Sequence, residues 1–238
     1  MSDKKKPRSY LAEAATAVPF IALVKWLWPD AIPFEVFSFW NSKGDFSTWM
    51  FTAWPVFAWA FGVTAVILLA KLNPRSRNVP DISGGAAFVS GLLVSVWCGF
   101  VEEVCFRWLL FLNAIVAVEI TNYLIFGFAG FGIAEWLHLH VVGPFADFTT
   151  LHHLHVYLFD KGWAVGAAML STNAFFRDGH KHHGLFGVIN SWFLGMYFFW
   201  ILFTFGLWPA ILVHFAYDAI VFTLEAASIA IRRDWAGA

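Results

Sequence analysis

The chain has 238 residues, of which 60% are hydrophobic and only 13% charged. Soluble domains have about 25% charged residues, so this composition excludes an ordinary soluble protein and indicates an integral membrane protein. The formal net charge of -1 shows no excess of positive charge of the kind that binds nucleic acid, so we expect no nucleic-acid partner.

Seven apolar segments are candidate membrane helices, because a helix needs about 20 residues to cross a hydrocarbon core of about 30 Å. In chain order they are Tyr10–Trp28, Phe46–Ala70, Ser83–Phe111, Ala114–Ala134, Trp163–Phe176, Gly187–Phe205 and Trp208–Ile231. Open sheet edges do not survive in lipid. The sequence therefore predicts an all-α fold, a polytopic transmembrane helical bundle with about six to eight membrane segments.

The charges at the two ends predict the topology of this multi-pass protein. Four cations in residues 1–8 precede the first apolar segment, and the positive-inside rule keeps such an N-terminus in the cytoplasm. Arg232 and Arg233 predict the same side for the C-terminus. The number of crossings is then even, so one of the seven segments is expected to be re-entrant.

Two carboxylates and an arginine interrupt the third apolar segment. Glu102, Glu103 and Arg107 are the only charged residues between Gly84 and Val118, and each costs about 2.5–3.5 kcal/mol at the centre of a bilayer. Glu103 and Arg107 are four residues apart and can pair on one helix face. Glu102 points about 100° away and has no local partner, which makes it a candidate functional residue.

Two further polar pairs recur at helical spacing. Phe176 and His180 are four residues apart, and so are His214 and Asp218, which interrupt the otherwise apolar final helix. Residues at this spacing share one helix face. Three polar sets on three segments predict one shared centre. A purely structural network of interhelical hydrogen bonds is the alternative.

The motifs Glu-Glu-x-x-x-Arg at 102–107, Phe-x-x-x-His at 176–180 and His-x-x-x-Asp at 214–218 resemble, in this order, the three motifs of the CPBP family. This family comprises CAAX prenyl endopeptidases and bacteriocin-processing or immunity (Abi-type) membrane proteases. The resemblance covers about Ser83–Phe222. It implies N-terminal anchor helices in residues 1–82 and a catalytic helical core in residues 83–238.

The resemblance also implies the chemistry of the site. Glu102 and His180 would hold and activate a water molecule, with Glu102 as the general base, while Glu103 and Arg107 would form a structural pair. The substrates would be membrane-associated or lipidated peptides or proteins, within a lipid environment. We expect no organic cofactor. Glutamate and histidine serve both metal-dependent and metal-free hydrolysis, so a divalent metal stays an open alternative.

The third motif departs from the pattern of the family. His214 and Asp218 would line the site and help to stabilise the oxyanion, but Asp218 stands where the family often has asparagine. An ionised aspartate cannot donate a hydrogen bond. We therefore expect Asp218 to orient His214.

The spacing between the first two motifs is longer than is usual in the family, which predicts an insertion at about residues 136–162. The insertion contains five histidines, His138, His140, His152, His153 and His155. One of them could replace His180 as the residue of the second motif, but Phe176 precedes His180 at the required spacing. We interpret the five histidines as loop residues near the membrane surface.

The nine histidines of the chain raise a second class of function, a membrane di-iron oxygenase or desaturase that uses its histidine clusters as metal ligands. The spacing within the clusters disfavours this function, because no cluster has a histidine that is followed, after two or three residues, by a histidine pair. A third class is a proton-coupled transporter or membrane scaffold that uses the buried glutamates as a proton relay. Bound metal would favour the oxygenase, and proton flux would favour the transporter.

Overall fold

The computed structural model describes residues 10–71, 82–127 and 132–237. These residues are almost entirely helical and include no β-strand, which confirms the predicted all-α fold. Four helical segments are long and apolar enough to cross a membrane: Phe46–Leu69, Gly84–Ile125, Lys181–Phe205 and Leu207–Asp234. They indicate a membrane protein. The N-terminal cations that predict the orientation lie outside the described residues.

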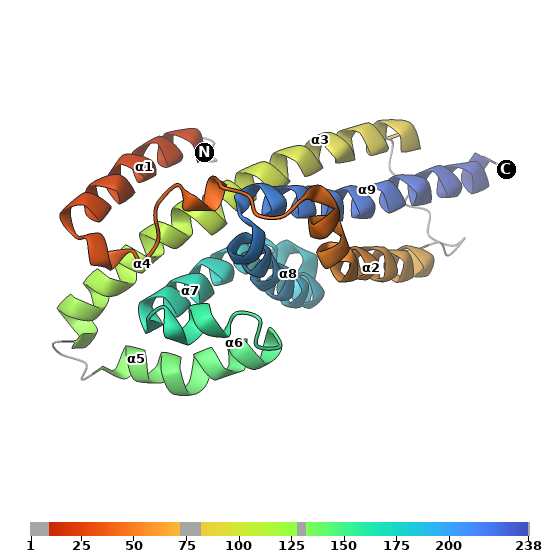
Figure 1. The fold of residues 1–238 in the computed structure, drawn as a ribbon. Helices are drawn as coiled ribbons and strands as arrows, with labels where there is room; N and C mark the ends of the chain where they lie inside the picture. The colour runs from red at the N-terminus through yellow and green to blue at the C-terminus, as the bar shows by residue number, and fades with distance from the viewer. Residues whose placement is uncertain (1–9, 72–81, 128–131, 238) are drawn as a thin grey trace, which may run out of the picture. The chain divides into compact units, whose positions relative to one another are not determined.

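Nine α-helices are assigned in the described residues (Figure 1): α1 (Tyr10–Leu27), α2 (Phe46–Lys71), α3 (Gly84–Glu102), α4 (Phe111–Thr121), α5 (Ile133–Leu137), α6 (Gly143–Thr149), α7 (Trp163–Gly179), α8 (Gly184–Phe205) and α9 (Leu207–Gly237). Short 3-10 helices occupy Pro29–Ala31, Ser38–Trp40 and Lys181–His183. The wider turns of a π-helix occupy Glu103–Leu110, Asn122–Gly127, His138–Val142 and Val156–Asp160.

The predicted break between the third and fourth apolar segments is wrong. The backbone is helical without interruption from Gly84 to Ile125. The polar residue in the predicted gap, Asn113, donates from Nδ2 to the carbonyl oxygen of Leu109 at 2.7 Å. A polar side chain that bonds to its own helix satisfies one of its donors locally, so Asn113 does not end the helix.

Contacts divide the chain into two compact units. Unit 1 consists of residues 1–41 and 104–203, and unit 2 consists of residues 42–103 and 204–238. The α2 helix thus belongs with α3 and α9, across the predicted boundary between residues 82 and 83. That boundary separates anchor from catalytic helices, and it stays a prediction.

In unit 2, α9 packs against both α3 and α2 (Figure 1). Glycines on α3 allow the close approach. A Cβ atom at Gly91 would lie 2.6 Å from Phe222 Cβ, and one at Gly99 would lie 3.0 Å from the backbone nitrogen of Phe215. Small residues let membrane helices approach in this way. The contacts run antiparallel, so the C-terminal end of α3 lies beside the N-terminal half of α9.

The α2 helix of unit 2 begins with a capped turn. The carboxylate of Asp45 accepts hydrogen bonds from the backbone nitrogen of Thr48 and the hydroxyl of Ser47, both at 2.8 Å. Such a side chain satisfies a helix donor that has no partner within the helix. The bonds from Thr48 and Ser47 lower the pKa of Asp45. The cap therefore fixes the start of the first of the four apolar segments.

In unit 1, α4 packs against α7 around an aromatic core. Phe111 of α4 is fully buried, and its ring centroid lies 5.3 Å from that of Phe199 and 5.8 Å from that of Phe34. Trp108 donates from its indole nitrogen to the carbonyl oxygen of Val36 at 2.7 Å. The aromatic residues of the sequence thus supply the core of this unit as well as exposed apolar surface.

The predicted insertion is largely helical. It contains part of α5, all of α6 and the π-helices His138–Val142 and Val156–Asp160. The interpretation of its histidines as loop residues is wrong for His138 and His140, which lie in the π-helix His138–Val142. His138 is buried, with its Nε2 2.9 Å from the carbonyl oxygen of Leu158. Gly166 makes room for the ring, since a Cβ atom there would lie 2.6 Å from Nε2.

Candidate functional site

The two adjacent glutamates of the first motif reach the same histidine from opposite sides of its ring. In unit 2, His214 Nδ1 lies 2.8 Å from Glu103 Oε1, and His214 Nε2 lies 3.8 Å from Glu102 Oε2. His214 and Glu103 are both buried, whereas the Glu102 side chain is 25% exposed. Glu103 is therefore an internal partner of the imidazole, and Glu102 is the carboxylate that a substrate or water can reach.

Local backbone structure explains how neighbouring residues meet one ring. The α3 helix ends at Glu102, and the π-helix begins at Glu103. Single π-turns inside α-helices are rare and occur often at functional sites. The close approach of Gly99 to Ile211 and Phe215 of α9 brings this junction beside His214. The α3–α9 packing and the π-turn together position the cluster.

The Glu103 contact fixes the chemistry of the imidazole. An ionised carboxylate only accepts hydrogen bonds, so His214 Nδ1 donates to Glu103. In a neutral ring the lone pair then lies on Nε2, the nitrogen that faces Glu102. A histidine whose second nitrogen is held by a carboxylate is fixed in both tautomer and orientation. The arrangement thus presents one defined nitrogen beside a partly exposed carboxylate.

Asp218 lies on the same side of the ring as Glu102. Its Oδ2 is 3.7 Å from His214 Nε2, and its side chain is 20% exposed. The predicted role of Asp218 in orienting His214 stays a prediction, and the short hydrogen bond of the ring is the one that Nδ1 donates to Glu103. The two separations from Nε2, 3.7 and 3.8 Å, are longer than a direct hydrogen bond and suit a bridging water.

Arg107 and His180 belong to unit 1, where Phe176 connects them. The guanidinium carbon of buried Arg107 lies 4.0 Å from the centroid of the Phe176 ring, a cation–π contact. The Phe176 ring is 4.7 Å from that of His180, and His180 Nδ1 lies 2.9 Å from the Phe176 carbonyl oxygen. The arginine of the first motif therefore packs on the phenylalanine of the second. The predicted Glu103–Arg107 pair stays a prediction.

The hydrogen bond within the second motif also defines a tautomer. A carbonyl oxygen only accepts, so His180 Nδ1 donates to Phe176 and leaves the lone pair of the neutral ring on Nε2. Beside it, Asp178 accepts from Lys181 and Arg177, each at 2.7 Å. These bonds and charges lower the pKa of Asp178, so the acid next to this motif is a paired anion.

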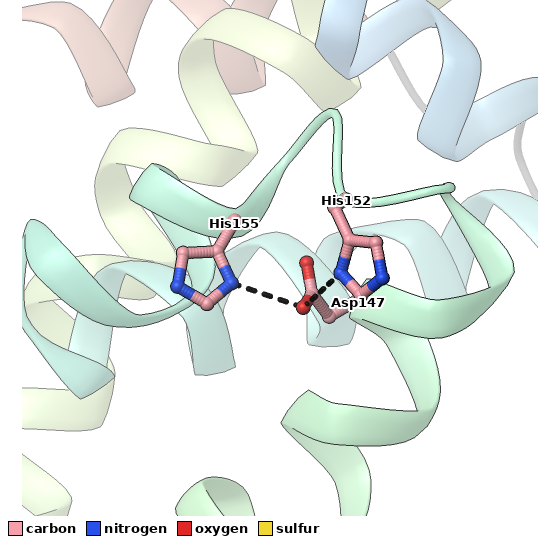
Figure 2. Close-up of side chains that lie close together, drawn as sticks. All are labelled: Asp147, His152 and His155. Carbon is pink, nitrogen blue, oxygen red and sulfur yellow. Dashed lines mark hydrogen bonds and ion pairs between the residues drawn. The ribbon is translucent and has the colours of Figure 1, made fainter.

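A third polar group lies in the insertion, in unit 1. Asp147 Oδ2 is 2.7 Å from His152 Nδ1 and 2.9 Å from His155 Nδ1 (Figure 2). Burial raises the pKa of Asp147, but the bonds from the two histidines outweigh that effect, and the pKa is lowered. The bond from His155 to Asp147 raises the pKa of His155. The sequence analysis did not identify Asp147, although its spacing to the histidine cluster was a signal.

The other histidines of the insertion have different surroundings. His140 Nδ1 lies 2.9 Å from the Trp136 carbonyl oxygen, and the His153 ring stacks on Trp200 with centroids 4.7 Å apart. With His138 held by Leu158, the five histidines do not form one centre. Within the described parts of the chain, one group of three side chains can share a metal ion: Asp147, His152 and His155.

Comparisons of the chain with models of known families, with curated proteins and with solved structures give no match.

Proposed function

We propose that the chain is an intramembrane endopeptidase of the CPBP type, with about six to eight membrane segments, that hydrolyses peptide bonds with an activated water. The observation that carries this proposal is the contact of His214 with both adjacent glutamates of the first motif. It joins the two glutamates of the first motif to the histidine of the third motif within unit 2, with Glu103 buried and Glu102 partly exposed.

The proposed mechanism begins with a water held among three groups: Glu102, Asp218 and His214 Nε2. Glu102 removes a proton from this water while the water oxygen forms a bond to the carbonyl carbon of the substrate. The electron pair of the carbonyl bond moves onto its oxygen, giving a tetrahedral oxyanion. When this intermediate collapses, the carbon–nitrogen bond breaks and the proton on Glu102 passes to the leaving amine.

The position of Glu102 supports this role. Its side chain is partly exposed and lies beside His214 Nε2, so it can accept a proton from a water held there. Glu103 keeps the His214 ring in place, so Nε2 does not have to reorient during the reaction. Preorganised polar groups of this kind contribute about 3–4 kcal/mol each to transition-state stabilisation.

The resemblance assigns His180 to the same reaction, as a group that holds the water with Glu102. The bond from His180 Nδ1 to Phe176 supports a role that uses Nε2. A His180→Ala substitution tests this role directly. We expect the loss of cleavage with retention of the folded chain, because His180 is only partly buried.

A proton-coupled transporter is the second candidate, favoured by one observation. Glu102, Asp218 and His214 form a chain of ionisable groups within apolar helices, and such chains serve as proton relays in membrane transporters. The transporter predicts proton flux across liposomes without peptide cleavage. The scattered contacts of His138, His140 and His153 disfavour a di-iron oxygenase.

The test is a cleavage assay on purified full-length protein in lipid nanodiscs. A peptide panel in lipidated and unlipidated forms is incubated with and without chelator, and the products are identified by mass spectrometry. We expect cleavage that is lost in Glu102→Gln. No cleavage of any peptide, together with proton flux in liposomes, would favour the transporter.

A further inference from the structure

The Asp147 cluster has the composition and geometry of a metal site that the proposed protease does not use. Its three potential ligand atoms are one carboxylate oxygen and two imidazole nitrogens, all within 4.8 Å of one another. They come from three adjacent parts of the fold (Figure 2): Asp147 lies in α6, His152 lies in the turn that follows it, and His155 is the N-cap of the π-helix Val156–Asp160. The cluster lies between the apolar segments, outside the four candidate spans.

The hydrogen bonds to the Asp147 carboxylate all fall on one of its two oxygens. Both imidazoles approach the same oxygen, Oδ2, at 2.7 and 2.9 Å. The second oxygen, Oδ1, is buried and receives no hydrogen bond from the described residues. A buried acceptor without a donor is destabilising. A cation on this carboxylate would compensate for that cost.

The backbone of the turn holds the His152 side chain toward Asp147. Leu151 and His152 have φ angles of 50° and 61°, the left-handed region that side-chain-bearing residues seldom adopt. His152 N also donates to the Asp147 carbonyl oxygen at 2.9 Å. Such conformations persist where the surrounding structure enforces them and cluster at ligand sites. The turn therefore directs the His152 ring back to α6.

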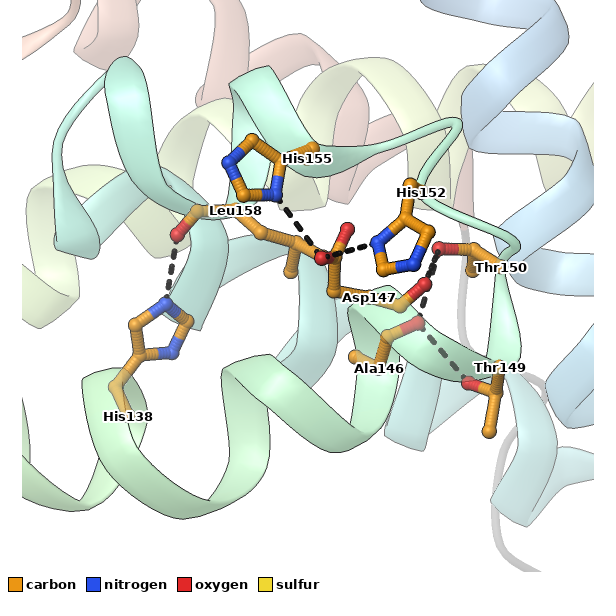
Figure 3. Close-up of polar contacts among 8 residues, drawn as sticks. All are labelled: His138, Ala146, Asp147, Thr149, Thr150, His152, His155 and Leu158. Carbon is orange, nitrogen blue, oxygen red and sulfur yellow. Dashed lines mark hydrogen bonds and ion pairs between the residues drawn. The ribbon is translucent and has the colours of Figure 1, made fainter.

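A wider set of hydrogen bonds keeps Asp147 in position (Figure 3). The hydroxyls of Thr149 and Thr150 donate to the Ala146 carbonyl oxygen at 3.0 and 2.9 Å. Thr150 also donates to the Asp147 carbonyl oxygen at 3.2 Å. The end of α6 is thus closed by its own side chains, and the carboxylate projects from a fixed backbone.

From these contacts we propose that Asp147, His152 and His155 bind one divalent zinc ion. Zinc takes histidine nitrogen at about 2.0–2.1 Å and carboxylate oxygen at about 2.0–2.2 Å, in a tetrahedron whose ligand atoms are about 3.3–3.5 Å apart. The two nitrogen–oxygen separations, 2.7 and 2.9 Å, need to lengthen by only about half an ångström to reach that spacing. Rotation of the two exposed imidazoles provides this change.

Solvent exposure allows water to be the fourth ligand. The side chains of His152 and His155 are 71% and 52% exposed, whereas that of Asp147 is 9% exposed. Water can therefore complete a site with three protein ligands. The role of the zinc is to fasten the turn after α6 to the end of that helix.

The test measures zinc binding to the full-length protein, purified in detergent without a polyhistidine tag and stripped with chelator. Calorimetric titration with Zn²⁺ should give one equivalent bound. Co²⁺ should give the visible absorption of a tetrahedral site. In the double variant His152→Ala/His155→Ala we expect affinity to fall at least about 100-fold, because removing ligands costs more than the 10–100-fold of an outer-shell change.

The matched control is His140→Ala/His153→Ala, which removes two exposed histidines of the same insertion outside the cluster. It should keep one equivalent and the Co²⁺ spectrum. A second control, His182→Ala/His183→Ala, removes a histidine pair whose rings lie 3.9 Å apart. Loss of binding in that variant with retention in His152→Ala/His155→Ala would overturn the assignment, and so would the absence of stoichiometric binding to the wild-type chain.

Limited proteolysis provides a readout of the structural role. Zinc should slow the cleavage of the turn Thr150–His155 by at least about 10-fold in the wild type and in both controls, and not in His152→Ala/His155→Ala. Equal protection of that variant would contradict the role. Neither experiment uses peptide hydrolysis, so the zinc site and the proposed protease can fail independently.

Discussion

His214 Nδ1 lies 2.8 Å from Glu103 Oε1, although the two residues are 111 positions apart in the chain. Both side chains are buried, so the pair is closed to solvent. A hydrogen bond to a charged group contributes about 1.5–3 kcal/mol, and this one also sets which nitrogen of the ring faces Glu102. The same contact thus serves stability and the geometry of the candidate site.

A double-mutant cycle tests this pair. Glu103→Gln removes the charge, and His214→Gln removes the Nδ1 donor while it keeps a polar group near the position of Nε2. We expect each variant to be less stable than the wild type, with a coupling energy of about 1–3 kcal/mol in the cycle. Thermal and denaturant unfolding in detergent measure it. Additive effects would show that the two residues do not stabilise each other.

Much of the fold follows from the sequence, because hydrophobic runs long enough to cross a membrane can only be helices there. The boundaries of α2 and α8 agree with the predicted segments to within three residues, and α9 begins one residue before its predicted start but ends six residues beyond its predicted end. The break at Asn113 was wrong, because its side chain bonds to its own helix. Such local compensation depends on a rotamer that hydropathy does not encode.

The contact of Glu103 with His214 could not be predicted in the same way. Spacing rules consider residues three or four positions apart, and they favour Arg107. The contact with His214 arises from helix packing, through a stripe of small residues at Gly84, Gly91, Ser95 and Gly99. Their spacing was a readable signal of close helix approach. The sequence did not show which helix these small residues contact, and it did not show the π-helix that begins at Glu103.

Substitution of the base should separate catalysis from folding. Glu102→Gln keeps the shape of the side chain and removes its ability to accept a proton, so cleavage should fall by at least about 10²-fold. Thermal stability should change little, because the side chain is partly exposed. Glu225→Gln, at an exposed position on α9, is the matched control and should cleave normally. Near-normal turnover in Glu102→Gln would remove this residue from the mechanism.

Glycine substitutions test the packing that positions the site. Gly91→Ala places a methyl group 2.6 Å from Phe222 Cβ, and overpacking of this kind costs about 1–3 kcal/mol. Gly85→Ala, on the same helix, meets no atom within 4 Å and should be neutral or slightly stabilising, since alanine favours helix. Unfolding in detergent compares the two. Equal stability of both variants would contradict close packing of α3 on α9.

The histidines of the insertion should divide into structural and dispensable residues. Joint replacement of His140, His152, His153 and His155 by alanine should spare peptide cleavage, because all four are exposed. His138→Ala should instead lower stability by about 1–3 kcal/mol, since it leaves the buried Leu158 carbonyl without its donor. Cleavage and unfolding assays check both. Iron bound in about two equivalents by the wild type and lost in the fourfold variant would favour the oxygenase.

The last prediction concerns the charge at Asp218. Asp218→Asn should retain cleavage, because the amide keeps an acceptor toward the water and adds a donor for the oxyanion. Asp218→Ala has neither group, and its cleavage rate should fall by about 10²-fold. Steady-state cleavage rates with one peptide compare the two variants, and unfolding curves check that both are folded. Equal and complete inactivation by Asn and Ala would mean that the negative charge is required, as a metal ligand or a proton acceptor. Either Asp218 would then be a second base beside His214 Nε2 or a metal would take part, and the role of Asp218 as an acceptor that an amide can replace would have to be abandoned.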